Sequence, residues 1–211
     1  MRGVVVVGSL NVDVSVRAEH LPRAGETVRA GGLELGPGGK GANQAIAAAR
    51  LGARVQMVGR IGGDRFAEIP LAALREAQVD ATFVRTSPHT HTGTALIVVD
   101  DRSGQNAIAV AGGANRDLTP DDVRDAVAAF RAAGVLLVQL EAPLETIETA
   151  LAQALECGVR TVLDPAPARE LSDELLKKVD LLTPNEIEAE LLTGIQVVDV
   201  ESAARAGLRL R

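Results

Sequence analysis

The sequence of 211 residues contains no tryptophan, no tyrosine and three phenylalanines, and it has a single cysteine. With so few aromatic side chains, it offers no platforms on which nucleic-acid bases would stack. Cys157 cannot form a disulfide within the chain, which favours a reducing compartment, and we expect a cytoplasmic protein. The apolar run over residues 4–7 is too short for a signal peptide or a membrane span.

A strong excess of charge of one sign is also lacking. The chain carries 22 Lys and Arg against 28 Asp and Glu, a formal net charge of −6. This mild acidity gives no reason to expect a nucleic acid or an anionic membrane as partner. The length suits one α/β domain with a sizeable core, and no linker or repeat divides it, so we predict a single domain over residues 1–211.

Glycine, by contrast, is concentrated in one stretch. Residues 36–45 read Gly-Pro-Gly-Gly-Lys-Gly-Ala-Asn-Gln-Ala and lead into a helical run over residues 46–51, which Gly52 ends. Glycine allows close approach to the main chain, and the start of a helix carries a partial positive charge. Lys40 adds a full charge. We therefore expect a polar group with existing or developing negative charge against this turn, rather than a turn that only joins two elements.

Two familiar phosphate-binding motifs do not explain this stretch. The spacing of Gly36, Gly38 and Gly41 fits the dinucleotide pattern G-x-G-x-x-G, but that pattern follows a buried strand, and residues 29–35 are polar. The phosphate-loop pattern requires Ser or Thr after the lysine, whereas Gly41 follows Lys40.

Strand and helix patterns alternate along most of the chain. Residues 4–8 read as a strand buried on both faces, and a regular strand–helix alternation follows residue 119, which predicts a doubly wound, mainly parallel sheet. Its helices are predicted from residue 120 to about 133, over 144–156 and over 186–192, and the Asn-x-x-Glu pattern predicts Asn185 as the cap of the last one. Strands over 12–16 and 27–35 and a hairpin of 94–99 with 106–111 predict a small β layer, with its strands in about 12–35 and 92–111. A helix over 65–77 contains Pro70, so it kinks or starts late near residue 69; the role of this proline is not predicted.

Polar side chains follow the ends of the predicted core strands. Asn11 and Asp13 alternate with apolar residues, so both point to one face, which favours a grip on hydroxyl groups. The carboxyl ends of parallel strands meet at one edge, where open α/β sheets bind ligands. The full set of strand-end residues is Asn11, Asp13, Asp64, Glu141, Asp164 and Asn185.

The segment 38–45 resembles the first signature of the ribokinase family of carbohydrate and nucleoside kinases, in the version that contains a lysine. Gly52 and Gly62 follow at the family's spacing, and residues 139–141, 164–171 and 183–190 resemble later ribokinase segments in the right order. The resemblance implies a ribokinase-like sheet with the small β layer as a lid, which often also forms a homodimer.

The resemblance also implies an activity: ATP-dependent phosphorylation of D-ribose to D-ribose 5-phosphate, with Mg²⁺ and a monovalent cation (K⁺) as further cofactors. It assigns ATP or its phosphates to Asn185 and the metal to Glu188. The residues that it assigns to the sugar are Asn11, Asp13, Gly38, Gly39, Lys40, Asn43 and Glu141.

One departure from the family pattern stands out. The second signature, which holds the catalytic base and the anion hole, has no match in these residues, so we expect the base beyond Arg211 and this chain alone to be inactive. Two other hypotheses stay open. One is a kinase for deoxyribose, a nucleoside or another small sugar, and the other is a sugar-binding fragment without catalysis.

Overall fold

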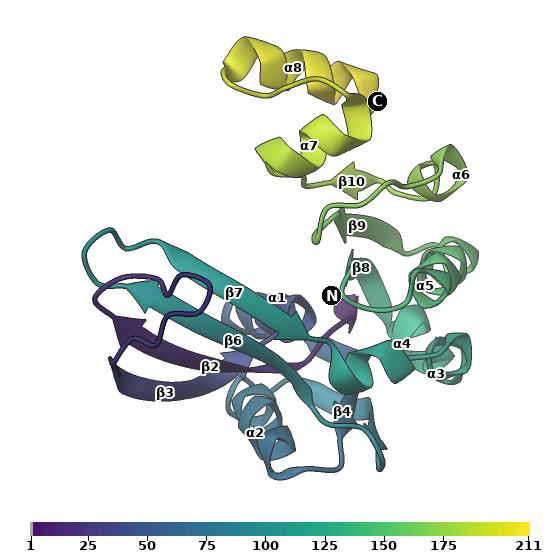
Figure 1. Cartoon of the computed structure of the whole chain (residues 1–211). Helices are drawn as coiled ribbons and strands as arrows, with labels where there is room; N and C mark the ends of the chain where they lie inside the picture. Colours follow the sequence, from purple (N-terminus) through teal and green to yellow (C-terminus); the bar gives the residue numbers. More distant parts are fainter. Residues whose placement is uncertain (1) are drawn as a thin grey trace.

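The computed structural model describes residues 2–211 as a six-stranded parallel sheet with helices on both faces, and a second, four-stranded sheet beside it (Figure 1). The strand order of the larger sheet is β10-β9-β8-β1-β4-β5, and each neighbouring pair is parallel. The chain thus builds outward in both directions from β1, which confirms the predicted doubly wound architecture. Its strands are β1 Gly3–Val7, β4 Val55–Gly62, β5 Asp80–Ser87, β8 Ala133–Gln139, β9 Arg160–Asp164 and β10 Leu181–Leu182.

The valine run in β1 explains why this strand lies at the centre. Successive side chains of a strand point to opposite faces. Val5 and Val7 join one buried cluster with residues of α3, α4 and α5, whereas Val6 joins another with residues of α1 and α2. A strand that is apolar on both faces requires this double cover.

The smaller sheet has the strand order β3-β2-β6-β7. β2 pairs antiparallel with β3 and parallel with β6, and β6 and β7 form the predicted hairpin. In Figure 1 this sheet extends away from the body as a long flap. Its strands are β2 Asn11–Ala18, β3 Ala30–Gly38, β6 Gly93–Asp100 and β7 Asn106–Ala111.

The helices match the sequence patterns with two exceptions. α5 spans Leu144–Glu156, the predicted range, and α2 starts late, at Glu68. Pro70 is therefore the third residue of α2, where a missing N–H removes no intrahelical bond. The helix predicted from residue 120 to about 133 is instead two short helices that meet at the buried Ala126. The other helices are α1 Lys40–Arg50, η1 Arg65–Ala67, η2 Gly113–Asp117, α3 Pro120–Asp125, α4 Val127–Ala132, α6 Asp173–Leu176, α7 Glu186–Thr193 and α8 Val200–Arg209.

The glycine stretch is the second exception. Residues 36–38 close β3, a turn occurs at Gly39 with φ of 90°, and α1 already begins at Lys40 rather than near residue 46. β5 was not predicted, because its residues alternate poorly between buried and exposed positions.

The C-terminal segment is more loosely attached than the rest. β10 is a two-residue edge strand, and α7 packs chiefly against α8 at one end of the molecule (Figure 1). Several large apolar side chains here are exposed, among them Ile187 at 72% and Val200 at 87%. Within residues 2–211, no helix has the length and apolar character needed to span a membrane.

Candidate functional site

The first turn of α1 is where several of the predicted site residues meet. The backbone N–H of Lys40 donates to Oε2 of Glu141 over 3.0 Å, and the hydroxyl of Ser9 donates to the same oxygen over 2.5 Å. The N–H of Gly41 in turn donates to Oγ of Ser9 over 3.2 Å. The first two backbone N–H groups of α1 thus donate to a carboxylate that follows β8 and to a hydroxyl that follows β1.

The negative group expected against this helix end belongs to the protein itself. The free N–H groups and the dipole of α1 attract the carboxylate of Glu141. Within the described residues no hydrogen bond involves Oε1 of Glu141, so this oxygen remains an acceptor for a ligand. The helix end therefore orients an acid of the site.

Asp13 lies beside this pair. A Cβ on Gly38 would be 2.0 Å from Oδ1 of Asp13, so the carboxylate lies directly against the glycine backbone and any side chain at position 38 would displace it. Burial, and then the negative charge of Glu141, raise the pKa of Asp13 above its ordinary value. Two carboxylates share this corner, an arrangement suited to binding hydroxyl groups.

Asn11 points to the same face of β2 as Asp13, and it is more deeply buried, with 3% of its surface exposed. Its Oδ1 accepts a hydrogen bond of 2.7 Å from Nδ2 of Asn115, which lies in η2. The sequence patterns predicted Asn11 but gave no indication of its partner.

Asp164, at the end of β9, belongs to the same electrostatic neighbourhood. Burial raises its pKa, the positive charge of Lys40 lowers it, and the charges of Glu188 and Glu141 raise it again, with a net upward shift. Asp164 at the end of β9 is thus coupled to Glu141 after β8 and to Glu188 on α7. The predicted convergence at this edge of the sheet therefore holds for these residues.

Two glutamines connect α1 to this acid. Nε2 of Gln139 donates to Oε1 of Gln44 over 2.6 Å, and Nε2 of Gln44 donates to Oδ2 of Asp164 over 3.4 Å. Gln139 is fully buried, and its own Oε1 has no hydrogen-bond partner within the part of the chain that the structure describes. Because the carboxylate of Asp164 only accepts, the NH₂ group of Gln44 must face it, and the oxygen of Gln44 then faces Gln139.

Asn185 and Glu188 form a capping box at the start of α7, as the pattern Asn-x-x-Glu predicted. The side chain of Asn185 accepts from the N–H of Glu188 over 2.9 Å. Glu188 accepts from the N–H of Asn185 over 2.8 Å and from its Nδ2 over 3.0 Å. Both oxygens of the buried Glu188 are thus used within one helical turn.

Two further residues of the predicted set lie apart from these hydrogen bonds. Asp64 accepts hydrogen bonds from the backbone N–H and the hydroxyl of Thr92, and its side chain caps η1. Burial raises the pKa of Asp64, but these hydrogen bonds lower it by more, so its pKa lies below the ordinary value. Asp64 therefore supports the loop before β6. Asn43 is exposed on α1, where its N–H donates to the carbonyl of Gly39 over 2.9 Å.

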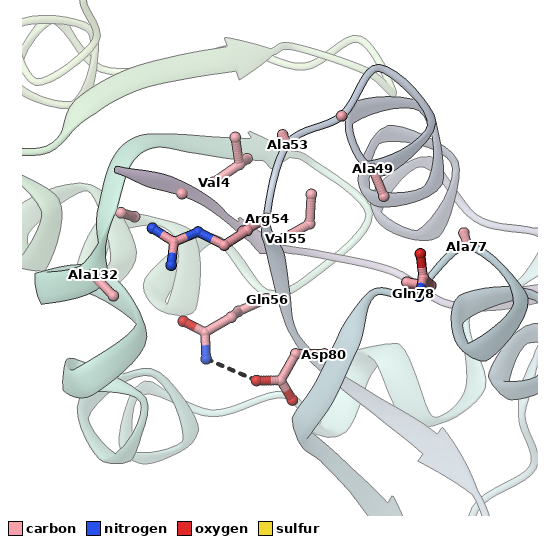
Figure 2. Close-up of a pocket in the computed structure, with 13 residues that line it drawn as sticks. Val4, Ala49, Ala53, Arg54, Val55, Gln56, Ala77, Gln78, Asp80 and Ala132 are labelled. Carbon is pink, nitrogen blue, oxygen red and sulfur yellow. Dashed lines mark hydrogen bonds between the residues drawn. The ribbon is translucent and has the colours of Figure 1, made fainter. Parts of the chain in front are cut away.

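A hollow of about 530 Å³ lies at the opposite edge of the sheet, where β1, β4, β5 and β8 begin. Arg54 and Gln56 reach into it, and Nε2 of Gln56 donates to Oδ2 of Asp80 over 3.0 Å (Figure 2). None of the predicted site residues lines this hollow. Because ligands bind at the carboxyl ends of strands in such sheets, the α1 edge is the better candidate.

Sequence reasoning missed the residues that orient the site. Gln44 and Gln139 stood inside the segments used for the resemblance, and Ser9 follows the first strand after Gly8, yet no pattern marked them. Asn115 lies 104 residues from its partner Asn11, a separation that no local pattern spans.

Comparisons with known proteins identify the family of this chain. A family model described as pfkB family carbohydrate kinase matches residues 1–211. The ribokinase of Haemophilus influenzae is 43% identical over 201 residues, which covers 95% of this chain and 65% of that protein. The deoxyribokinase of Salmonella typhi is 38% identical over 207 residues, covering 98% of this chain and 67% of the relative. This chain therefore spans about two thirds of these relatives' length.

Solved structures give the same result. A ribokinase from Arabidopsis thaliana, in complex with ribose and ATP, matches with a TM-score of 0.87 at 34% identity, covering 99% of this chain and 68% of that one. The ribokinase from Giardia lamblia matches with a TM-score of 0.87 at 29% identity, covering 98% and 65%. The family resemblance seen in the sequence is thereby confirmed.

Proposed function

This chain belongs to the pfkB family of carbohydrate kinases, and on that premise we propose that the protein transfers the γ-phosphoryl group of ATP to D-ribose, giving D-ribose 5-phosphate. The observation that carries the proposal is the corner formed by Asp13, Glu141 and the start of α1. Two relatives, 43% identical over 201 residues and 42% identical over 200 residues, are named ribokinases.

In this proposal the corner binds the sugar. Asp13 and the free oxygen of Glu141 accept hydrogen bonds from sugar hydroxyls, and Asn11 adds an amide beside them. The backbone at Gly38 and Gly39 lets the sugar approach closely, because no side chain intervenes. Lys40 and Asn43, on the first turn of α1, complete the proposed contacts.

The phosphate side is proposed to lie near Asp164 and α7. Asn185 would contact the nucleotide phosphates, and Glu188, with Asp164 near it, would hold Mg²⁺, an ion that binds carboxylate oxygens and retains much of its hydration. The fit is electrostatic. Burial, and to a smaller extent the charges of Glu188 and Glu141, raise the pKa of Asp164 against the lowering effect of Lys40, and a divalent cation would relieve the repulsion between these acids. When bound there, Mg²⁺ would neutralise part of the phosphate charge that develops during the transfer. A requirement for K⁺ rests on the resemblance alone.

Deoxyribose is the second candidate substrate, because a relative at 38% identity is named a deoxyribokinase. The two sugars differ by one hydroxyl. A site built to bind that hydroxyl discriminates by orders of magnitude in kcat/KM, and a site that ignores it does not. Rates measured with both sugars therefore separate the two candidates.

We propose that the small sheet acts as a lid over the sugar and also forms the surface of a homodimer. The protein itself is proposed to be cytoplasmic. The exposed apolar side chains of the small sheet support a protein partner. They are Leu33, Leu35, Leu96, Ile108 and Val110, each at least 49% exposed. Analytical ultracentrifugation of the protein and of an Ile108→Glu variant tests this: the variant should be monomeric, and equal association of both proteins would contradict the lid interface.

Calorimetric titration with ribose tests sugar binding directly. We expect one saturable site per chain, abolished by an Asp13→Ala substitution. Absence of ribose binding in correctly folded protein would contradict the proposal, because every assigned sugar contact except the base lies within residues 1–211.

An ADP-release assay tests the transfer. The family's base belongs to a signature without a match here, so the assay compares the 211-residue chain with one extended to the relatives' length. We expect turnover from the extended chain. Equal turnover from both would assign the base to a residue present here, with Asp164 the first candidate because its raised pKa suits a proton acceptor.

A further inference from the structure

Asn115 lies where the chain returns from the small sheet to the body, in η2 directly after β7. It is 2% exposed, and its side chain bridges two consecutive residues at the entry to the sheet. Oδ1 of Asn115 accepts from the backbone N–H of Leu10 over 2.9 Å, and Nδ2 donates to Oδ1 of Asn11 over 2.7 Å.

These two bonds determine the orientation of both amides. A backbone N–H can only donate, so the atom of Asn115 that faces Leu10 must be its oxygen. The NH₂ of Asn115 then faces Asn11, and because an NH₂ only donates, the facing atom of Asn11 must be oxygen as well. The NH₂ of Asn11 is left pointing away, and within residues 2–211 it makes no hydrogen bond.

Gly93 shows how tightly this pair is enclosed. A Cβ at position 93 would be 2.1 Å from Oδ1 of Asn11 and 2.3 Å from Nδ2 of Asn115. The two amides therefore cannot separate toward β6, and any side chain at this position would displace them.

We propose that Asn115 is a positioning residue that holds the amide of Asn11 so that its NH₂ group, a donor only, faces the sugar. The inference rests on the proposed function for the identity of the ligand, but not for the orientation itself. The carboxylate of Asp13 only accepts. One sugar hydroxyl can then accept from Asn11 and donate to Asp13, which uses both of its hydrogen-bonding capacities.

The first test replaces Asn115 with Asp, which is similar in shape but has no NH₂. The new carboxylate still accepts from Leu10, and it attracts the NH₂ of Asn11, so the amide of Asn11 turns over and presents oxygen to the sugar. We expect the Kd for ribose, measured by calorimetry, to rise about tenfold, the effect of one lost hydrogen bond. An unchanged Kd would overturn the proposal.

A double-mutant cycle separates positioning from general damage. If Asn115 acts through Asn11, the Asn115→Asp substitution should change the Kd by less than about twofold in an Asn11→Ala background. The same tenfold loss in both backgrounds would show that Asn115 only supports the fold. Thr146→Val is the matched control, since it removes a buried hydrogen bond of 2.7 Å to the carbonyl of Leu118 in the body; it should leave the Kd unchanged.

A measurement without ribose checks the orientation alone. In ¹⁵N-labelled protein, the side-chain NH₂ resonances of Asn11 should move downfield in Asn115→Asp, because that group then donates to a carboxylate. Resonances that stay in place would overturn the inference. If wild-type protein failed to bind ribose while the resonances moved, the proposed substrate would be wrong and the positioning role would stand.

Discussion

The two sides of the candidate site are held in place by different means. On the sugar side, Glu141 is bound by Ser9 and Asn11 by Asn115, across separations of 132 and 104 residues. On the phosphate side, Asn185 and Glu188 bind each other within one helical turn. The first arrangement exists only when β1, β2, β8 and η2 are brought together, whereas the second needs only α7 and its cap.

The packing around the two sides of the site differs in the same way. The sugar side rests on β1, whose valines are buried in two clusters, while α7 packs chiefly on α8 and leaves Ile187 and Leu191 exposed. Long-range contacts hold a site against the core of the fold. Local sequence patterns, however, do not reveal them. A local motif is easy to read, yet the fold supports it less.

Asp13→Asn should have the largest effect on the sugar side. The substitution keeps the shape but loses charge-assisted hydrogen bonds worth about 1.5–3 kcal/mol each, so ribose affinity should fall by about ten- to a hundredfold in a calorimetric titration. Asp80→Asn, at the opposite edge of the sheet, is the control and should leave ribose affinity unchanged. Equal losses from both would mean that the site lies elsewhere.

Gly41→Ala tests the rigidity of the sugar side. A Cβ at Gly41 would be 2.6 Å from the backbone nitrogen of Ser9, so the substitution should lower the free energy of unfolding by about 1–3 kcal/mol in a denaturant titration. Gly36→Ala, in the same stretch, meets no atom within 4 Å and should cost little. Similar costs at both positions would refute the tight contact between α1 and the loop after β1.

Glu188→Gln probes the phosphate side in a chain of the relatives' full length. We expect the Mg²⁺ concentration for half-maximal rate to rise about tenfold, as for the loss of an outer-shell ligand, with ribose affinity unaltered. Glu186→Gln, an exposed neighbour in the same helical turn, is the matched control. If neither variant shifts the Mg²⁺ dependence, Glu188 is a helix cap and nothing more.

Two capping boxes extend the comparison to stability. Thr119 caps α3 with Asp122, which also binds Arg60 over 2.7 Å and Arg85 over 3.0 Å. Thr119→Ala and Asn185→Ala should each cost about 1 kcal/mol. In hydrogen exchange, the first should weaken protection across the body and the second only in α7. Identical exchange patterns would remove the contrast between the two regions.

The smallest effect concerns pH. Burial and the charge of Glu141 raise the pKa of Asp13, so its ionised form opposes folding at neutral pH, and this penalty disappears as the pH falls through the raised pKa. Asp13→Asn should therefore raise Tm at neutral pH, by at most roughly 2–4 °C because solvent screens a partly exposed carboxylate. The gain should shrink toward acidic pH. A gain that grows on acidification would contradict this assignment.

The sequence predicted the elements whose signals are local. The valines of β1, the range of α5 and the cap at Asn185 each follow from periodicity or capping chemistry. β5 escaped because an edge strand needs no clear alternation, and the helix break at Ala126 escaped because it depends on packing. The glycine stretch was read as one turn, although pairing with β2 draws residues 36–38 into β3.

The candidate site divided in the same way. Strand-end positions and the family resemblance predicted Asp13, Glu141 and Asp164, and the structure couples them electrostatically. Ser9 and Asn115 could not be predicted, because their importance arises from hydrogen bonds to residues more than a hundred positions away.

The central place of β1 has a consequence for synthesis on the ribosome. One of its neighbours, β8, begins about 130 residues after β1, so that edge of β1 stays open for roughly 7–26 s at about 5–20 residues per second. An apolar strand waiting that long for its partner is exposed to premature pairing with other nascent chains. Because of this order of synthesis, a chaperone that covers β1 would protect the chain until β8 has been made.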